Sequence, residues 1–276
     1  MKQKFEFKSI VAETLLIPLY MRAKESRRRN DAILHDQLAE QLVDNIEYDY
    51  SKFDGAKLSA IGCVVRGWYF DDAIRRFIAS HKHPVVVNVG CGLDTRYQRI
   101  EAHNKAMFYE LDLPEVIELR NKLIPEPKRD KYIPASLLET EWMDELRSKH
   151  PDSDFIFVVE GVFMYFYEKQ VRQVLRHLAD RFAGGELWFD ACGTIMSRHG
   201  LKPDSLRDHK AQIRSGISDG HEVERWEPRL QLIKQGIYQR YFPKRWGLGG
   251  RLLGLFPRFS CKFSSLLGYH ILNSAK

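Results

Sequence analysis

The sequence predicts an α/β fold of the Rossmann-like type, with a mostly parallel sheet, helices on both faces and an N-terminal helical cover. From residue 84 onward, short β-branched or aromatic runs alternate with helical patterns, and parallel strands require such crossover connections. The first of these runs ends at Gly90 and Gly92, just before a helix start. Only a side-chain-free backbone approaches a bound cofactor closely, so this turn indicates a nucleotide-cofactor loop.

Length and composition fit a globular protein with one α/β domain or two small ones, because 276 residues can bury a sizeable core. The four cysteines form no Cys-x-x-Cys pair, which favours reduced, buried thiols and neither a disulfide framework nor a metal site. No signal peptide is recognisable, and no apolar run reaches the ~20 residues of a membrane helix. We therefore expect a cytoplasmic protein.

Charge is unevenly distributed along the chain. The net charge is +6, and no acidic residue follows Glu227. A basic C-terminal region can attract an anionic substrate, a membrane surface or nucleic acid, although a solvated basic surface is the ordinary explanation. The apolar run 252–256 lies beside several arginines, but glycine and proline interrupt it, so it is a weak amphipathic helix.

Residues 1–82 form the expected helical cover. Apolar residues recur at helical spacing from Lys8 to Leu42, with a basic break at 27–29, and again from Leu58 to Ser80. Two arginines within these patterns, Arg22 and Arg66, have apolar neighbours. Most such arginines are surface charges, yet both are candidates for binding an anionic ligand.

Residues 83–193 form the expected cofactor-binding core. The patterns predict strands near 85–89, 106–111, 132–133, 155–159 and 186–192, and helices over 95–102, 114–123, 141–149 and 168–182. Ligands of such sheets bind beyond the carboxyl ends of the strands. Acidic residues occur at three of these ends, as Glu110 with Asp112, Glu160, and Asp190, and a carboxylate at the second strand can accept hydrogen bonds from ribose hydroxyls.

Residues 194–276 should supply acceptor-side helices and the last strands. The stretch Thr194–Gly220 is polar with a helical pattern, Arg229–Gln239 predicts a strand, and Tyr269–Leu272 a final one. If this segment folds over the strand ends, a histidine could serve as proton acceptor; the candidates are His199, His209 and His221. Each is individually more typical of a surface residue, so no catalytic residue is assigned.

Two cofactors compete for the glycine turn. A dinucleotide fingerprint needs a third glycine three residues after Gly92, where Thr95 stands, and no Gly-Lys-Ser/Thr phosphate loop occurs. Arginines and strand-end acids suit a ligand with a carboxylate, a ribose and a cationic centre. These features favour S-adenosylmethionine.

Three motifs in their order along the chain carry a family resemblance. They are Val87-Asn88-Val89-Gly90-Cys91-Gly92-Leu93-Asp94-Thr95-Arg96, Tyr109-Glu110-Leu111-Asp112-Leu113-Pro114 and Val159-Glu160-Gly161-Val162-Phe163-Met164-Tyr165. From about Leu15 to the C-terminus the sequence resembles the leucine carboxyl methyltransferase family, including its bacterial polyketide O-methyltransferase branch. The resemblance implies a class I methyltransferase fold that uses S-adenosylmethionine.

The resemblance also implies site residues. Arg66 would pair with the cofactor carboxylate and Gly90 would approach the methionine part. Asp112 would hold the ribose with Glu110 nearby, and Glu160 would lie near the amino group. Arg22 falls in the family's N-terminal basic motif. Family members commonly have Asp-Leu at the adenine side, where this chain has Ser136-Leu137.

The function expected from these residues is in-line methyl transfer to a hydroxyl or carboxylate of a small molecule, such as a polyketide or another secondary metabolite. Tyr165 could orient that acceptor or simply pack. The alternatives are methylation of a protein C-terminal carboxylate, and cofactor binding without catalysis. Nucleic acid is a less favoured partner because no Asn/Asp-Pro-Pro-aromatic motif occurs. The oligomeric state is not predicted.

Overall fold

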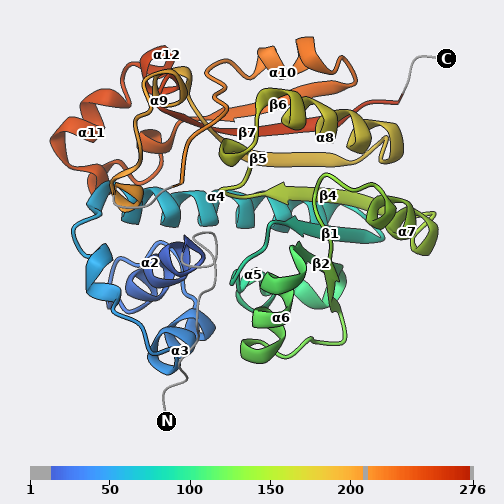
Figure 1. Ribbon diagram of the computed structural model, residues 1–276, viewed down its shortest axis with the longest axis horizontal. Coiled ribbons are helices and arrows are strands. Elements are labelled where there is room, and N and C mark those ends of the chain that lie inside the picture. The colour runs from blue at the N-terminus through green and yellow to red at the C-terminus, as the bar shows by residue number, and fades with distance from the viewer. Residues whose placement is uncertain (1–13, 208–210, 274–276) are drawn as a thin grey trace.

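The computed structural model describes residues 14–207 and 211–273, and its centre is a seven-stranded sheet (Figure 1). The strands lie in the order β3-β2-β1-β4-β5-β7-β6. Their bounds are β1 Pro84–Val89, β2 Met107–Asp112, β3 Asp130–Pro134, β4 Asp154–Val159, β5 Glu186–Cys192, β6 Leu230–Gly236 and β7 Ser264–Ile271. All neighbours pair in parallel except β7, which runs antiparallel to β5 and β6. This confirms the predicted α/β class with a mostly parallel sheet.

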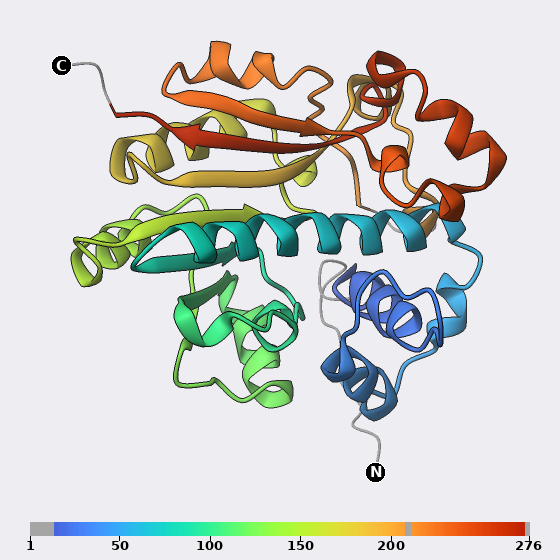
Figure 2. The same cartoon turned by 180° about the vertical axis from the view of Figure 1, so that it is seen from behind.

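Alternating side chains of the central strands build two cores, one on each face of the sheet. Val85, Val87 and Val89 point to the face covered by α7 Glu141–Lys149 and α8 Glu168–Arg181. Val86 points to the other face, which packs against α4 Lys57–Ser80. Figure 2 shows α4 running along its face of the sheet. Because both faces of the sheet are covered, β1 is a nearly continuous apolar run, which only Asn88 interrupts.

The carboxyl ends of the parallel strands face a small helical layer. It comprises α2 Leu16–Ser26, α3 Gln37–Asn45 and η1 Tyr50–Phe53, which share an apolar cluster with Leu93 and Leu206. Asp36 caps α3 by accepting a hydrogen bond from the Ala39 amide. The long helix α4 does not belong to this cover, because its apolar residues pack on the sheet itself.

The remaining helices are short. Those before β5 are α5 Arg96–Arg99, η2 His103–Lys105, α6 Pro114–Leu123 and η3 Phe163–Tyr165. Those after β5 are α9 Thr194–Arg198, η4 Asp204–Leu206, α10 His221–Trp226, η5 Tyr238–Arg240, η6 Pro243–Trp246, α11 Gly247–Leu253 and α12 Pro257–Ser260. Within the described chain no helix is long and apolar enough to cross a membrane.

Two sequence predictions about elements were wrong. The stretch 194–220 is not a continuous helix: beyond α9 and η4 its described residues are largely irregular, because they follow the outline of a cavity and bond to the loops beneath them. The last strand begins at Ser264, five residues before the predicted start, because small and apolar residues of β7 pair along the whole of β5. Residues 8–13 of the first helical pattern lie outside the described residues.

Candidate active site

A cavity of about 1490 Å³ opens beyond the carboxyl ends of β1, β2, β4 and β5. Its other walls come from α2, the start of α4, the segment after β5, and α11. Single-ligand pockets are typically ~300–1,000 Å³. The cavity therefore has room for a nucleotide-sized molecule and a second molecule beside it.

The glycine turn after β1 forms one wall of the cavity, and its shape requires glycine. Gly90 and Gly92 have φ angles of +70° and +50°, where a side chain is strained. A Cβ atom at Gly90 would lie 2.3 Å from Val162 Cγ2, and one at Gly92 would lie 2.9 Å from Leu15 Cδ2. The turn is thus packed against the residues that precede η3 and α2, and it has no space for a methyl group.

Asp112 joins the end of β2 to this turn. One carboxylate oxygen accepts a hydrogen bond from the Gly92 amide at 2.8 Å, and the other accepts one from the Leu113 amide at 2.8 Å. Burial raises the pKa of Asp112, although both amides favour its ionised form. The carboxylate lines the cavity, so its remaining lone pairs are available to hydroxyl donors of a ligand.

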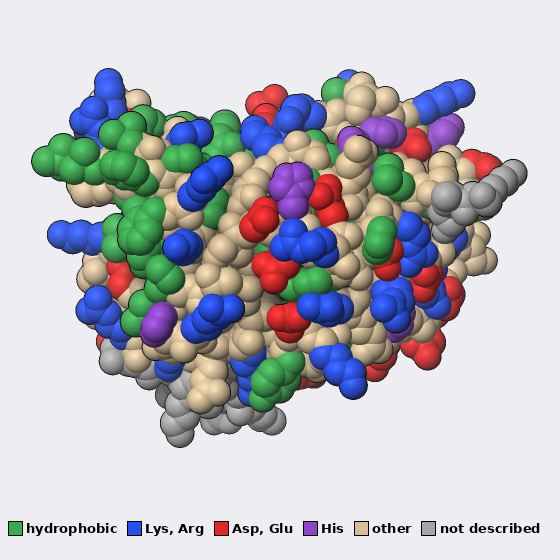
Figure 3. Space-filling view, turned by 90° about the horizontal axis from the view of Figure 1, so that it is seen from above, with side chains coloured by type: hydrophobic (Ala, Val, Ile, Leu, Met, Phe, Trp, Pro, Cys, Tyr) green, Lys and Arg blue, Asp and Glu red, His purple; other side chains and the backbone are tan. Residues whose placement is uncertain are grey.

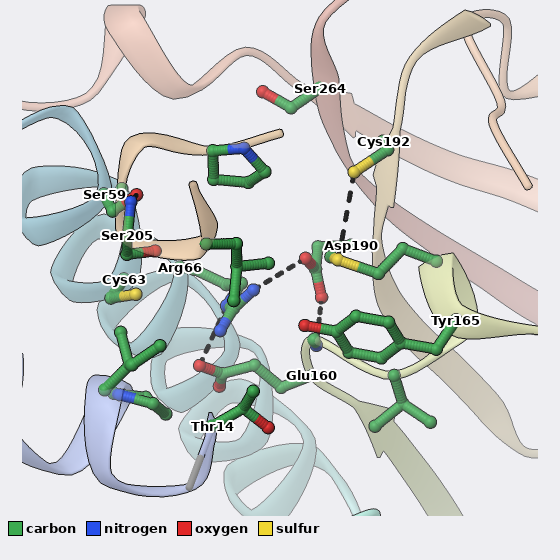
Figure 4. A pocket seen from close by; sticks show the side chains of 18 of the residues that line it. Thr14, Ser59, Cys63, Arg66, Glu160, Tyr165, Asp190, Cys192, Ser205 and Ser264 are labelled. Atoms are coloured by element: carbon green, nitrogen blue, oxygen red, sulfur yellow. Dashed lines mark hydrogen bonds and ion pairs between the residues drawn. The ribbon is translucent and has the colours of Figure 1, made fainter. Parts of the chain in front are cut away.

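Arg66 lies in the middle of the cavity wall between two carboxylates (Figure 4). Its Nε donates to Glu160 at 3.0 Å, and its Nη1 donates to Asp190 at 2.8 Å. Asp190 also accepts a hydrogen bond from the Gly161 amide at 2.6 Å. Among the described residues Arg66 Nη2 has no hydrogen-bond partner, which leaves it available for a ligand carboxylate.

Glu160 connects Arg66 to a buried ionic network behind the glycine turn. Its second oxygen accepts a hydrogen bond from Arg96 Nη2 at 2.6 Å, and Arg96 is completely buried. Arg96 also binds Asp71 at 2.8 Å and Asp94 at 2.8 Å. Burial alone would raise the pKa of Asp71, but the Arg99 and Arg96 guanidinium groups hold it below its usual range. The site is thus fixed by paired charges away from water.

Two further arginines hold the carbonyl groups of the turn. Arg22 Nη2 donates to the Leu93 carbonyl at 2.9 Å, while its Nε donates to Asp36 at 2.9 Å. Arg120, completely buried, donates to the carbonyls of Gly92 at 3.1 Å and Asp94 at 2.6 Å. Arg22 also lines the cavity. Both arginines therefore stabilise the shape of the loop from outside it.

Glu110 precedes Asp112 by two residues on β2 but does not reach the described cavity wall. It is completely buried, accepts a hydrogen bond from Asn88 Nδ2 at 2.8 Å and lies 3.6 Å from Arg120 Nη2. It is absent from the described cavity wall, because Asn88 and Arg120 lie against its carboxylate. Glu110 therefore contacts Asn88 and Arg120 and does not line the site for a ligand.

Ser136 and Leu137 follow β3 and line the cavity at its β2 side. The Ser136 hydroxyl accepts a hydrogen bond from the Leu138 amide at 3.2 Å, so it terminates the strand with a tight turn. Leu137 is 7 % exposed. Together they present a small polar group and an apolar face, near Asp112 on the neighbouring strand.

The other half of the cavity is apolar and rich in sulfur. Met164, Cys192 and Ile213 form a small cluster with Tyr165 and Met196. Burial raises the pKa of Tyr165 to about 12, which keeps the phenol neutral. In Figure 4 Tyr165 and Cys192 both lie beside Asp190. This half has the character of a pocket for an apolar or aromatic molecule.

The two described histidines among the candidate proton acceptors, His199 and His221, do not line this cavity. His199 is exposed, and His221, also exposed, pairs with Glu224 at 2.6 Å. Neither lines the described cavity wall, because the segment turns their side chains to solvent. His209 lies outside the described residues. In the described parts of the chain no group of three His, Cys, Asp or Glu residues is placed to hold a metal ion.

Sequence reasoning missed most of the network behind the site. It noted Asp190 as a strand-end acid and Arg96 as the last residue of the first motif, without a role for either, and it assigned no role to Asp71 or Arg99. Asp71, Asp72 and Arg96 can be read in the sequence. A single sequence, however, does not show whether a charged side chain of a helix points into the protein. A signal that would have helped is the density of arginine around the glycine turn.

The fold and this site define a class I S-adenosylmethionine-dependent methyltransferase. Solved structures with the same fold include a DUF574 family protein from Streptomyces avermitilis, with a TM-score of 0.58, 12 % identity and coverage of 95 % of this chain and 99 % of that one. A putative methyltransferase from Thermobifida fusca has a TM-score of 0.55 and 14 % identity, covering 92 % and 94 % of the two chains. At these identities the likeness concerns the fold alone.

The sequence comparisons give the family. The model of the family described as leucine carboxyl methyltransferase matches residues 16–179, more than half of the chain. The tetracenomycin polyketide synthesis O-methyltransferase TcmP of Streptomyces glaucescens is 31 % identical over 225 residues, 82 % of each chain. The S-adenosyl-L-methionine-dependent methyltransferase dpfgK of Gibberella zeae is 26 % identical over 273 residues, 91 % of this chain and 90 % of that one. The chain belongs to the leucine carboxyl methyltransferase family, and its cofactor is S-adenosylmethionine.

Proposed function

We propose that this enzyme is an O-methyltransferase that acts on a hydroxyl or carboxylate of a small molecule, such as a polyketide or a related secondary metabolite. The observation that carries the proposal is the two-part cavity, with charged groups at the strand ends and an apolar, sulfur-rich half beside them. The similarity to TcmP, which is named as an O-methyltransferase of tetracenomycin polyketide synthesis, supports the same class of acceptor.

The residues present fit S-adenosylmethionine. Asp112 offers carboxylate oxygens for ribose hydroxyls, Arg66 offers Nη2 for a carboxylate, and Glu160 offers negative charge for an ammonium group. Gly90 leaves the backbone bare where a Cβ atom would collide with Val162. Ser136 and Leu137 provide a polar and an apolar contact for the adenine side.

Two assigned residues act through others in this proposal. Arg22 positions the turn through the Leu93 carbonyl, and Glu110 positions Arg120, which in turn holds the Gly92 carbonyl. The chain then serves one methyltransferase domain: within 1–82 the helices before α4 form the cover while α4 packs on the sheet, 83–193 form the cofactor core, and 194–276 form the acceptor side. The cytoplasmic location stays a prediction, which cell fractionation checks.

When bound, the cofactor supplies an electrophilic methyl group on a sulfonium centre. The protein's contribution is to align the acceptor oxygen behind that methyl group and to exclude water. Tyr165, neutral through burial, can donate a hydrogen bond that orients the acceptor. An acceptor that is ionised already, a carboxylate or an acidic phenol, needs no proton acceptor from the wall.

The test is methyl transfer from labelled S-adenosylmethionine to hydroxylated aromatic polyketides, to aromatic carboxylic acids and to a peptide ending in leucine. We expect label in a small molecule. Treatment with base distinguishes the acceptor atom, because a methyl ester releases methanol and a phenol ether does not. Label only in the peptide would support methylation of a protein C-terminus, and cofactor binding without label in any acceptor would contradict catalysis.

A further inference from the structure

Helices α11 and α12 and the turn between them carry a cluster of exposed apolar side chains. We call it the apolar ridge, and it comprises Leu248, Leu252, Leu255, Phe256 and Phe259, with exposed fractions of 74, 52, 68, 63 and 49 %. The other large apolar side chains that are exposed in the described chain occur singly, at Leu58, Leu113, Tyr167, Leu201, Ile233 and Leu272. A cluster of this kind marks an interaction surface, whereas single exposed residues need no explanation.

The apolar ridge is surrounded by positive charge. Lys244, Arg251, Arg258 and Lys262 are all exposed, and no acidic residue follows Glu227 in the sequence. In the part of the chain that the structure describes, none of these four side chains has an ion-pair partner. Charge complementarity therefore favours an anionic partner.

The shape of the apolar ridge favours a bilayer over a protein. Figure 1 places α11 and α12 at one end of the molecule, beyond the strands, and Figure 3 shows hydrophobic side chains gathered there with Lys and Arg side chains beside them. Leucine and phenylalanine on a projecting end can enter the boundary between headgroups and acyl chains, while basic side chains reach the headgroups. A second copy of this chain would bring like charges together, which disfavours self-association.

The apolar ridge also adjoins the cavity. Leu248 belongs to both, and Trp246, Gly250 and Leu253 of the same segment line the cavity wall. We propose that α11 and α12 dock the enzyme on anionic lipid surfaces. A consequence that rests on the proposed function is that a lipid-soluble acceptor passes from the bilayer into the apolar half of the cavity beside this helix.

The test is co-sedimentation of the purified full chain with vesicles, without cofactor or acceptor, so that failure of the docking is separate from failure of the activity. One set of vesicles is phosphatidylcholine alone, and the other is an equal mixture of phosphatidylcholine and phosphatidylglycerol. We expect binding to the mixed vesicles, weakened by salt. The double substitution L255S/F256S should lower the partition coefficient by about tenfold or more, since each exposed side chain loses its apolar burial.

Matched variants separate the surface from general effects. L272S removes an exposed leucine from the other end of β7 and should leave binding unchanged. R251E/R258E should abolish binding, whereas R225E/K149E makes the same change of net charge elsewhere and should retain most of it. Equal binding to both vesicle types, or equal binding of wild type and L255S/F256S, would overturn the proposal. So would a dimer in sedimentation velocity that L255S/F256S dissociates, with no vesicle binding.

Discussion

The cavity has a cofactor half, with Arg66, Asp112 and Glu160, and an acceptor half, with Met164 and Cys192. The two halves differ in the interactions that hold their side chains. Behind the glycine turn, buried charges pair at short distances, as Arg99 does with Asp71 at 2.6 Å and Arg96 with Glu160 at 2.6 Å. The acceptor half is a cluster of methionine, cysteine and aromatic side chains under irregular chain. Paired buried charges tolerate little change, while soft apolar side chains adapt to different shapes.

The acceptor half is tied to the scaffold mainly through backbone and loop contacts. The Ile217 amide donates to the Cys192 carbonyl at 2.7 Å, and the Arg214 amide donates to the Met164 carbonyl at 2.8 Å. Asp204 accepts hydrogen bonds from the Leu58 and Ser59 amides and so caps the start of α4. Backbone contacts place few demands on side chains, so the lining can vary while the cofactor half stays fixed.

The largest expected effect comes from Arg96→Met. The substitution leaves Asp71, Asp94 and Glu160 buried without their shared cation, and breaking a buried pair costs about 3–5 kcal/mol. Urea denaturation should show a loss of that size. The exposed Arg225→Met is the control and should change the free energy of unfolding by about 0.5 kcal/mol at most. A loss of under about 1 kcal/mol for Arg96→Met would contradict a structural role for the network.

Gly90→Ala should lower the affinity for S-adenosylhomocysteine by about tenfold or more, because the new methyl group collides with Val162 and distorts the turn. Calorimetric titration measures the effect, and adding Val162→Ala should restore part of the affinity. Gly184→Ala is the matched control, since its φ is +87° and no atom lies within 4 Å of its Cβ position. It should cost about 1 kcal/mol of stability without changing affinity.

Asp130, at the start of β3 and 4.0 Å from Arg120, should make the stability of the fold depend on pH. Burial and the neighbouring Glu110 raise its pKa to about 8, and Arg120 opposes the shift. A carboxyl group with a raised pKa stabilises the fold fully below its unfolded pKa of ~3.9, and this contribution is lost as pH rises toward 8, because the native state holds the proton longer. In the wild type the free energy of unfolding, measured by urea denaturation, should therefore fall by up to about 1.4 kcal/mol per pH unit as the pH rises toward 8. Asp130→Asn should remove this decline. Exposed Asp152→Asn should leave the profile unchanged.

The sequence predicted the cofactor half better than the acceptor half, for physical reasons. Strand-end motifs are local, so Gly90, Asp112 and Glu160 could be placed at one edge before the fold was known. The partners Arg96 and Asp71 are far apart in sequence, and their burial depends on how α4 and α5 pack. The burial of Glu110 depends on Asn88 and Arg120, which contact it from other parts of the chain. The helical pattern over 194–220 failed because the described residues there bond to neighbouring loops and line the cavity.

The smallest expected effect is at Met196, in the acceptor half. Met196 is partly exposed, so Met196→Ala should cost about 1 kcal/mol or less of stability. It should leave the affinity for S-adenosylhomocysteine unchanged and alter KM for the acceptor. Met143 is completely buried in the core. As the contrasting variant, Met143→Ala should lower the free energy of unfolding by about 2–5 kcal/mol. A change in cofactor affinity for Met196→Ala would break the division into halves.

The most direct test of the central claim is calorimetric titration of the wild type and Arg66→Lys with S-adenosylhomocysteine, with folding checked by circular dichroism. We expect one site per chain, and a loss of affinity of about tenfold or more for Arg66→Lys. Lysine cannot bind Glu160, Asp190 and a ligand carboxylate in the fixed directions of a guanidinium group. Absence of binding by folded wild-type protein, or equal affinity of the two proteins, would contradict the assignment of this cavity as the cofactor site.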